Sequence, residues 1–176
     1  VWFFETGDDS QYGIPGWGNE ELQYYLPDNA RLEGGRLIIS AKRETVDDFG
    51  FTSARINTRD RFAFRYGRIE ASIKLPAGQG TWPAIWMLPS DPFRYATRCV
   101  AGDTWQGNPD CDAWPNSGEI DILEHVGYEM GHIHGTVHTK AYYWAVWEQR
   151  KGRILIDDVD RAFHDYVVEW SPERID

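Results

Sequence analysis

Gly118-Glu119-Ile120-Asp121-Ile122-Leu123-Glu124-His125 is the stretch that decides the fold, because its acidic and aliphatic residues alternate. A period of two is typical of a β-strand with one buried face. Glu119 and Asp121 are two residues apart and therefore point to the same face, whereas the odd offset of Glu124 points it the other way. One extra residue in a β-bulge around Ile122 and Leu123 would restore the phase. We therefore predict a bulge there and three carboxyl groups on one face.

Three carboxyl groups on one face suit the cleavage of a glycosidic bond. One group must protonate the leaving oxygen and another must attack or activate water, and in retaining enzymes the two lie about 5–5.5 Å apart. Glu119 and Glu124 can fill these roles. Asp121 can orient Glu119 through a hydrogen bond, and crowding of like charges would push the neighbouring pKa values apart. A solvated acidic strand face would show the same pattern, so the interpretation depends on the rest of the chain.

Further runs with a period of two predict an all-β domain. The clearest is Tyr66 to Leu75, where aliphatic residues oppose charged and polar ones. Turn-rich stretches separate the runs, and no segment has a sustained helical pattern with caps, so we expect an antiparallel sandwich or barrel with little helix. Residues 89–114 read as a long loop between two strands. The other predicted strands are 36–43, 51–58, 82–88, 119–125, 132–139 and 163–170.

Length and charge limit the kind of protein and of partner. With 176 residues the chain has the size of one domain with a substantial core. The net charge of -10 opposes nucleic acid, anionic membranes and sulfated polymers, so we expect neither a nucleic-acid nor a membrane partner. The chain has nine Trp and nine Tyr. Exposed aromatic side chains can stack on ring-shaped ligands, although large sandwiches also fill their cores with them.

The two cysteines, Cys99 and Cys111, lie in a segment rich in Gly, Pro, Asp and Asn. A disulfide closing this short loop would suit an oxidising compartment, and two free thiols in a cytosolic protein are the alternative. The N-terminal residues do not have the pattern of a signal peptide. We expect a secreted, extracellular protein whose signal peptide has been removed.

The catalytic stretch with its preceding residues 114–118 resembles the signature of glycoside hydrolase family 16. The extra residue between Asp121 and Glu124 makes it similar to the laminarinase-like branch. The resemblance implies a β-jelly-roll sandwich of two antiparallel sheets with a concave substrate cleft. It extends over nearly the whole chain through residues 17–25, 52–56, 66–70, 82–88, 135–138 and 163–166.

The same resemblance implies retaining endo-hydrolysis of a neutral, laminarin-like β-1,3-glucan through a covalent glycosyl-enzyme intermediate. Glu119 would be the nucleophile, Asp121 its assisting acid and Glu124 the general acid/base, with no cofactor for catalysis. For the tryptophans that match sugar-binding positions, a place in the core is the alternative. The residues implied to line the glycone side and the cleavage point are Asn19, Arg55, Trp82, Trp86, Trp114 and His138.

Several alternatives stay open. The substrate could be mixed-linkage β-1,3-1,4-glucan or a galactan such as agar, and a transglycosylase on the same scaffold would pass the covalent intermediate to a sugar. A non-catalytic glucan-recognition module is a further possibility, against which the intact Glu119 and Glu124 count. An alternative from a different class is a small β-barrel metalloenzyme. Its metal site could be formed by three histidines on the same face of one strand, His132, His134 and His138.

Two expectations concern stability rather than catalysis. Family members often carry a structural calcium that is held partly by backbone oxygens, and Glu5 and Gly35 lie where such ligands would fall. Family members also continue past Trp170-Ser171-Pro172 into further strands. We therefore expect residues 1–176 to be a single catalytic domain without its C-terminal strands, which a further segment or a second chain would supply to cover the open sheet edge.

Overall fold

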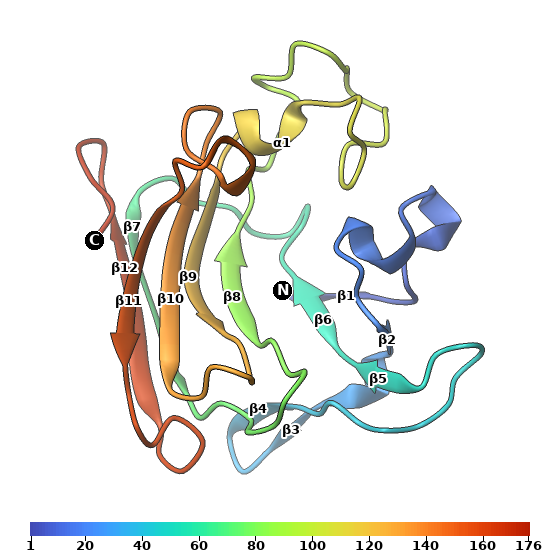
Figure 1. Ribbon diagram of the computed structural model, residues 1–176, viewed down its shortest axis with the longest axis vertical. Coiled ribbons are helices and arrows are strands. Elements are labelled where there is room, and N and C mark those ends of the chain that lie inside the picture. The colour runs from blue at the N-terminus through green and yellow to red at the C-terminus, as the bar shows by residue number, and fades with distance from the viewer. The chain divides into compact units, whose positions relative to one another are not determined.

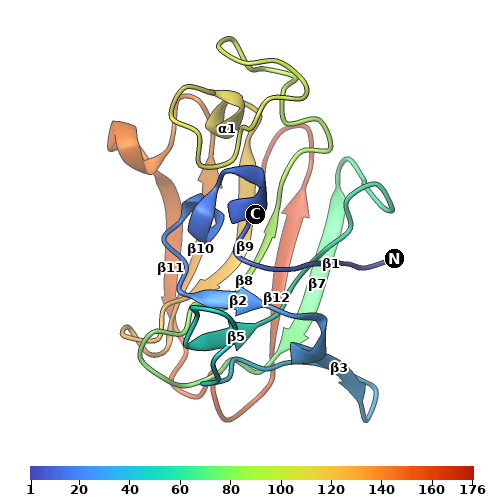
Figure 2. The ribbon, with the colours of Figure 1, turned by 90° about the vertical axis from the view of Figure 1, so that its right-hand side faces the viewer.

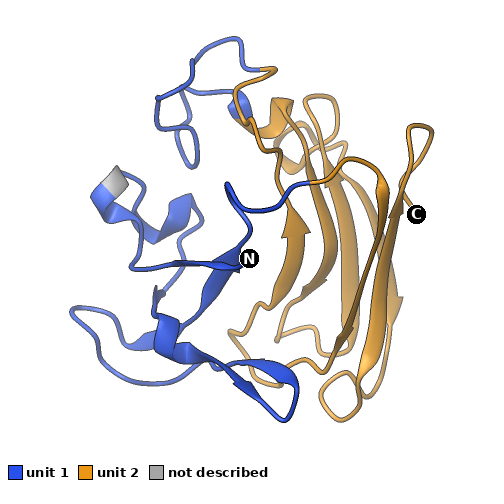
Figure 3. Ribbon diagram, turned by 180° about the vertical axis from the view of Figure 1, so that it is seen from behind, with its two compact units in different colours: residues 1–63, 96–113 blue, residues 64–95, 114–176 orange. Residues whose placement is uncertain are grey.

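Strands form most of the regular structure in the computed structural model, which describes residues 1–11 and 13–176 (Figure 1). The chain divides into two compact units (Figure 3): residues 1–63 with 96–113 form unit 1, and residues 64–95 with 114–176 form unit 2. The helical segments have only three or four residues each. The prediction of an all-β chain with little helix is therefore confirmed. Of the helices in the described part of the chain, none is long and apolar enough to cross a membrane.

Unit 1 is built from short strand pairs joined by 3-10 turns. β1 pairs with β6 and β3 with β4, both antiparallel. β2 pairs with β5 in parallel, which corrects the expectation of purely antiparallel sheets. The β3–β4 hairpin lies between these two strands in the sequence and supplies the long connection that a parallel pair needs. The elements are β1 (Phe3–Glu5), η1 (Ser10–Tyr12), η2 (Pro15–Gly18), β2 (Gln23–Tyr25), η3 (Pro27–Asn29), β3 (Ala30–Glu33), β4 (Arg36–Ile39), β5 (Phe51–Ser53) and β6 (Arg55–Asn57).

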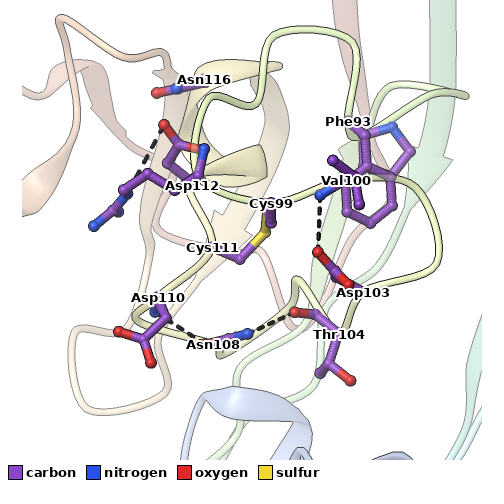
Figure 4. The surroundings of a disulfide bond; sticks show 12 residues. Phe93, Cys99, Val100, Asp103, Thr104, Asn108, Asp110, Cys111, Asp112 and Asn116 are labelled. Carbon is purple, nitrogen blue, oxygen red and sulfur yellow. Dashed lines mark hydrogen bonds and ion pairs between the residues drawn. A yellow bond between two sulfur atoms is a disulfide. The ribbon is translucent and has the colours of Figure 1, made fainter.

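A disulfide joins Cys99 to Cys111 within unit 1, so of the two alternatives for the cysteines the structure has the bridge (Figure 4). Asp112 beside it accepts hydrogen bonds from the hydroxyl and the backbone N–H of Thr97 and from the backbone N–H of Arg98. The bond from the Thr97 hydroxyl contributes most to the lowering of the pKa of Asp112. The loop is therefore fixed at its base by a covalent bond and by a charged acceptor.

Unit 2 contains two layers of strands. A four-stranded antiparallel sheet in the order β11-β10-β9-β8 forms one layer and the antiparallel β12–β7 pair forms the other (Figures 1 and 2). The short helix α1 (Ala113–Asn116) leads into the sheet and spans the boundary between the units. The remaining elements are β7 (Gly67–Ile73), β8 (Ala84–Met87), β9 (Glu119–His125), β10 (His132–His138), η4 (Trp144–Val146), β11 (Arg150–Leu155) and β12 (His164–Trp170).

The core of unit 2 lies between these two layers. Leu123 of β9 and Ile133 of β10 pack there with Tyr166 of β12, and their exposed fractions are 1%, 5% and 5%. Full burial of such a side chain stabilises a fold by about 1.5–3 kcal/mol. Since Leu123 fills the core, its strand neighbour Glu124 points to the opposite face. The core therefore fixes the face on which the polar residues of β9 lie.

The sequence predicted β9 with its observed bounds and β7, β10 and β12 to within two residues at each end. The predicted strand over 51–58 is wrong in one respect, because it is two strands with a break at Ala54. The chain changes partner there, from β2 to β1. Pleating alone does not reveal such a change of partner.

Candidate active site

β9 contains the predicted bulge. In its pairing with β8, Leu123 lies opposite Ile85 and Asp121 lies opposite Trp86, so Ile122 has no partner residue. In the pairing with β10, Ile122 and Leu123 together lie opposite the single residue Gly135, between the pairs Glu124–His134 and Asp121–Thr136. The prediction of a bulge is therefore confirmed, and the extra residue is Ile122.

The bulge brings Glu119, Asp121 and Glu124 to the face of β9 opposite the core. Glu119 and Asp121 share a side-chain hydrogen bond, and the charge of Asp121 acts on both glutamates. Leu123, on the other face, is buried in the core. The three predicted catalytic carboxyl groups therefore form one cluster.

Two tryptophans fix the two glutamates. The indole N–H of Trp114 donates to Oε2 of Glu119 at 2.5 Å, and that of Trp82 donates to Oε1 of Glu124 at 3.1 Å. Thr136 on β10 donates its hydroxyl to the other oxygen of Glu124 at 3.5 Å. Hydrogen bonds to a carboxylate favour its ionised form, so these donors orient each group and oppose its protonation.

Burial and crowding raise the pKa values of both glutamates. Burial, followed by the charge of Asp121, raises the pKa of Glu119 to about 8, and the same two causes raise the pKa of Glu124. Because Glu119 and Asp121 share a hydrogen bond, the retained proton belongs to the pair. The cluster therefore holds an acid at neutral pH as well as a carboxylate.

His138 completes the polar cluster from the end of β10. Its Nε2 lies 3.1 Å from Oδ2 of Asp121, and the residue is 8% exposed. Burial would lower the pKa of His138, but the hydrogen bond to Asp121 and the neighbouring carboxylates outweigh burial and raise it. The ring also packs against Trp114 at 5.6 Å between centroids. His138 therefore orients Asp121.

Four of the six predicted sugar-binding residues lie in unit 2 with the carboxyl cluster. Trp82, Trp114 and His138 contact it directly, and Trp86 lies on β8 opposite Asp121. Trp82 is 59% exposed, so it is not a core residue. The interpretation of these tryptophans as core packing is therefore wrong for Trp82.

The other two predicted sugar-binding residues, Asn19 and Arg55, lie in unit 1. The backbone N–H of Asn19 ends the η2 turn by donating to the carbonyl of Gly16 at 3.0 Å. The Nε of Arg55 donates to Glu5 at 2.5 Å, and its guanidinium lies over the ring of Trp17 at 4.5 Å. Both residues are held in fixed positions within their unit.

Comparison with known proteins decides the family. Residues 17–176 match the family model described as "Glycosyl hydrolases family 16". The chain belongs to this family. A beta-glucanase of Rhodothermus marinus is 46% identical over 170 residues, which cover 95% of this chain and 54% of that protein.

Solved structures give the same family 16 fold. The laminarinase catalytic domain of Thermotoga maritima superposes with a TM-score of 0.83 at 35% identity, over 99% of this chain and 65% of that one. The endo-beta-1,3-glucanase of Pyrococcus furiosus gives 0.82 at 37% identity, over 99% and 63%. The all-β jelly-roll fold is therefore confirmed. The chain spans about half to two thirds of the length of these relatives.

Metal binding in this family 16 chain is not supported by its side chains. The carboxylate of Glu5, a predicted calcium ligand, accepts from Arg55 and also contacts Arg59 at 3.5 Å. Gly35 lies in the β3–β4 turn. Among the described residues, no group of three His, Cys, Asp or Glu side chains could hold a metal.

The histidines proposed as a metal site have separate acidic partners. His134 lies 3.4 Å from Glu129, whereas His138 lies 3.1 Å from Asp121. Nδ1 of His132 is buried without a hydrogen-bond partner in the described part of the chain. The arrangement therefore does not gather the three imidazoles around one ion.

Sequence reasoning missed two residues of this family 16 site. Thr136 contacts Glu124, and Tyr143 packs edge-on against Trp114 with ring centroids 5.7 Å apart. Thr136 is two residues from His138, so both side chains lie on the same face of the strand, and this was a signal that Thr136 belongs to the site. Tyr143 follows the strand in a loop, where periodicity carries no information about contacts.

Proposed function

We propose that this chain is the catalytic part of a retaining endo-β-1,3-glucanase that hydrolyses neutral, laminarin-like glucan. The observation that carries the proposal is the bulge at Ile122, which brings Glu119 and Glu124 to one face with a separate indole donor on each. Retaining hydrolysis requires two such carboxyl groups with different tasks. The names of the relatives from Rhodothermus marinus and Pyrococcus furiosus support the reaction class.

In the first step, the carboxylate of Glu119 attacks the anomeric carbon while Glu124 gives its proton to the leaving glycosidic oxygen. The bond from carbon to that oxygen breaks, and a covalent bond to Glu119 forms. The indole N–H of Trp114 holds the attacking group, and the proton that Glu119 shares with Asp121 stays with the pair, so that Glu119 attacks as a carboxylate. The raised pKa of Glu124 keeps its proton available for the leaving group.

In the second step, Glu124 accepts a proton from water as the water attacks the same carbon. The bond to Glu119 breaks, the sugar leaves with its original anomeric configuration, and both glutamates return to their starting states. Two inversions at one carbon account for retention. No step uses a cofactor.

The substrate and location are further parts of the proposal. The net charge of -10 and the acidic cluster favour a neutral chain over a sulfated one. The disulfide Cys99–Cys111 supports a secreted protein, because such bonds persist in oxidising compartments. A calcium ion near Glu5 and Gly35 would have to use backbone oxygens, since Arg55 and Arg59 occupy the Glu5 carboxylate.

Product analysis tests the proposed function. The protein should release oligosaccharides from laminarin with the β-configuration at the new reducing end, as followed by proton NMR in the first minutes. Glu119→Gln should abolish release, whereas Glu70→Gln, at an exposed position of strand β7, should keep it. An α-configured first product, or an active Glu119→Gln enzyme, would refute the mechanism. Cleavage of lichenan or agarose in preference to laminarin would show that the substrate is a mixed-linkage glucan or a galactan and not the proposed β-1,3-glucan.

A further inference from the structure

The loop between β10 and β11, residues 139–149, carries two aromatic side chains that the carboxyl cluster does not use. The exposed fractions of Trp144 and Trp147 are 63% and 93%. Burial of large aromatic side chains is a main source of stability, and these two side chains forgo it. Packing within residues 1–176 therefore does not explain why indoles occupy these positions.

Backbone hydrogen bonds hold this loop in a defined shape. Thr139 and Tyr142 exchange two backbone bonds of 2.8 and 3.0 Å, and the N–H of Trp147 donates to the carbonyl of Trp144 at 3.1 Å. The guanidinium of Arg150, the first residue of β11, covers the ring of Tyr142 at 4.6 Å. The two exposed indoles are therefore presented by an ordered turn.

The backbone of Trp147 adds a second observation. Its φ of 60° and ψ of 20° place it in the left-handed region at the end of η4. Gly and Asn occupy such positions most readily, and a bulky residue there is uncommon. The turn itself does not need an indole at this position, so the reason lies in what the ring can contact.

The loop starts beside the residue that holds the proposed nucleophile. Tyr143 packs edge-on against Trp114, whose indole N–H donates to Glu119. Figures 1 and 2 show the loop projecting at the same end of unit 2 as α1, which contains Trp114. Aromatic surface therefore extends from the nucleophile through Trp114 and Tyr143 into the loop.

We propose that Trp144 and Trp147 form an aromatic platform that binds outer glucosyl units of the same neutral β-glucan chain that is cleaved at Glu119 and Glu124. The flat apolar faces of indoles match the C–H faces of pyranose rings, and the acidic character of the chain disfavours an anionic polymer. The inference rests on the proposed function and adds a dependence on chain length. Short substrates do not reach the platform, whereas long ones do.

The test uses the Trp144→Ala/Trp147→Ala double variant of the full-length protein and a series of β-1,3-gluco-oligosaccharides of increasing length. The loss in kcat/KM should grow with length to roughly tenfold on the longest substrates, the size expected for two lost stacking contacts. The matched control is Tyr128→Ala. This residue is 68% exposed and lies in the turn that joins the opposite ends of β9 and β10, and its variant should behave as wild type at every length.

A second readout needs no turnover. In the inactive Glu119→Gln background, laminarin should quench the intrinsic tryptophan fluorescence, and the double variant should bind it roughly tenfold more weakly. Circular dichroism and the melting temperature check that each variant folds.

The outcomes separate the platform from the function on which it rests. If the wild-type enzyme cleaves laminarin and the double variant shows the same dependence on chain length, the platform is overturned and the proposed function is not. An equal loss on all lengths also overturns it, because the loop would then act through Trp114. A wild-type enzyme that neither cleaves nor binds any β-glucan overturns the proposed function and the platform with it.

Discussion

Replacing Trp114 by Phe removes one hydrogen bond from Glu119 and keeps the aromatic contacts. The indole N–H lies 2.5 Å from Oε2 of Glu119, whereas the contacts of Trp114 with His138 and Tyr143 are made by its ring. Phe fills most of the same volume. The variant therefore isolates the contribution of one donor to the ionisation of Glu119.

The size of the effect follows from the strength of that bond. A hydrogen bond to a charged group contributes about 1.5–3 kcal/mol, and 1.36 kcal/mol corresponds to roughly one pKa unit. Burial and the charge of Asp121 already raise the pKa of Glu119, and the donor from Trp114 opposes them. Without the donor, the pKa of Glu119 should rise by about 1–2 units further. At neutral pH, kcat/KM should fall roughly tenfold to hundredfold, since less of the nucleophile is ionised.

The assay is the pH profile of kcat/KM on laminarin. In Trp114→Phe, the acidic limb should move to higher pH, because that limb reports the ionisation of the nucleophile in the free enzyme. The comparison variant is Trp82→Phe, which removes the donor to Glu124 and should move the alkaline limb instead. An acidic limb that stays in place in Trp114→Phe, with kcat/KM reduced equally at all pH values, would refute this account of how Trp114 acts.

Three further predictions concern stability. A Cβ at Gly127 would lie 1.8 Å from the carbonyl oxygen of Gly78. Gly127→Ala should therefore lower the free energy of unfolding, measured by urea titration, by about 2–4 kcal/mol. The control is Gly152→Ala, where a Cβ would have nothing within 4 Å, and its free energy of unfolding should stay within about 0.5 kcal/mol of wild type. Because folding raises the pKa of Glu119 from 4.5 to about 8, its contribution to stability is present below pH 4.5 and lost as the pH rises to 8. The melting temperature of Glu119→Gln should therefore rise relative to wild type from pH 5 to 8, and a constant difference would contradict the raised pKa. Glu5→Gln should destabilise the protein by about 1.5–3 kcal/mol, because it weakens the pair with Arg55. The loss should be the same in the presence of calcium and in the presence of a chelator. A loss seen only with calcium would show that Glu5 binds the ion.

The sequence alone predicted the catalytic strand because alternation and an odd offset between two acids leave few arrangements. The bulge at Ile122 follows from that offset once all three carboxyl groups must share a face. β11 was not predicted, because its apolar residues Ile154 and Leu155 come together at its end and all six of its residues are exposed. Its strand conformation comes from pairing with β10, a tertiary effect that local pattern does not encode.

The contacts of the site were less accessible to sequence reasoning than its residues. Trp82 and Trp114 were predicted as sugar-binding residues, but nothing in their spacing shows that each donates to a different glutamate. The parallel pairing of β2 with β5 was missed for a similar reason, since strand direction depends on how the chain returns in space. Such features need the coordinates of both partners.

The central claim is that Glu119 attacks the sugar and Glu124 exchanges the proton. A 2-deoxy-2-fluoro β-glucosyl reagent with a good leaving group should trap the covalent intermediate, because the fluorine slows both steps and the leaving group restores the first. Fragment-ion mass spectrometry of the peptide that contains residues 118–125 then locates the sugar. We expect the adduct on Glu119, with none on Glu124. An adduct on Glu124 or on Asp121 would contradict the assignment.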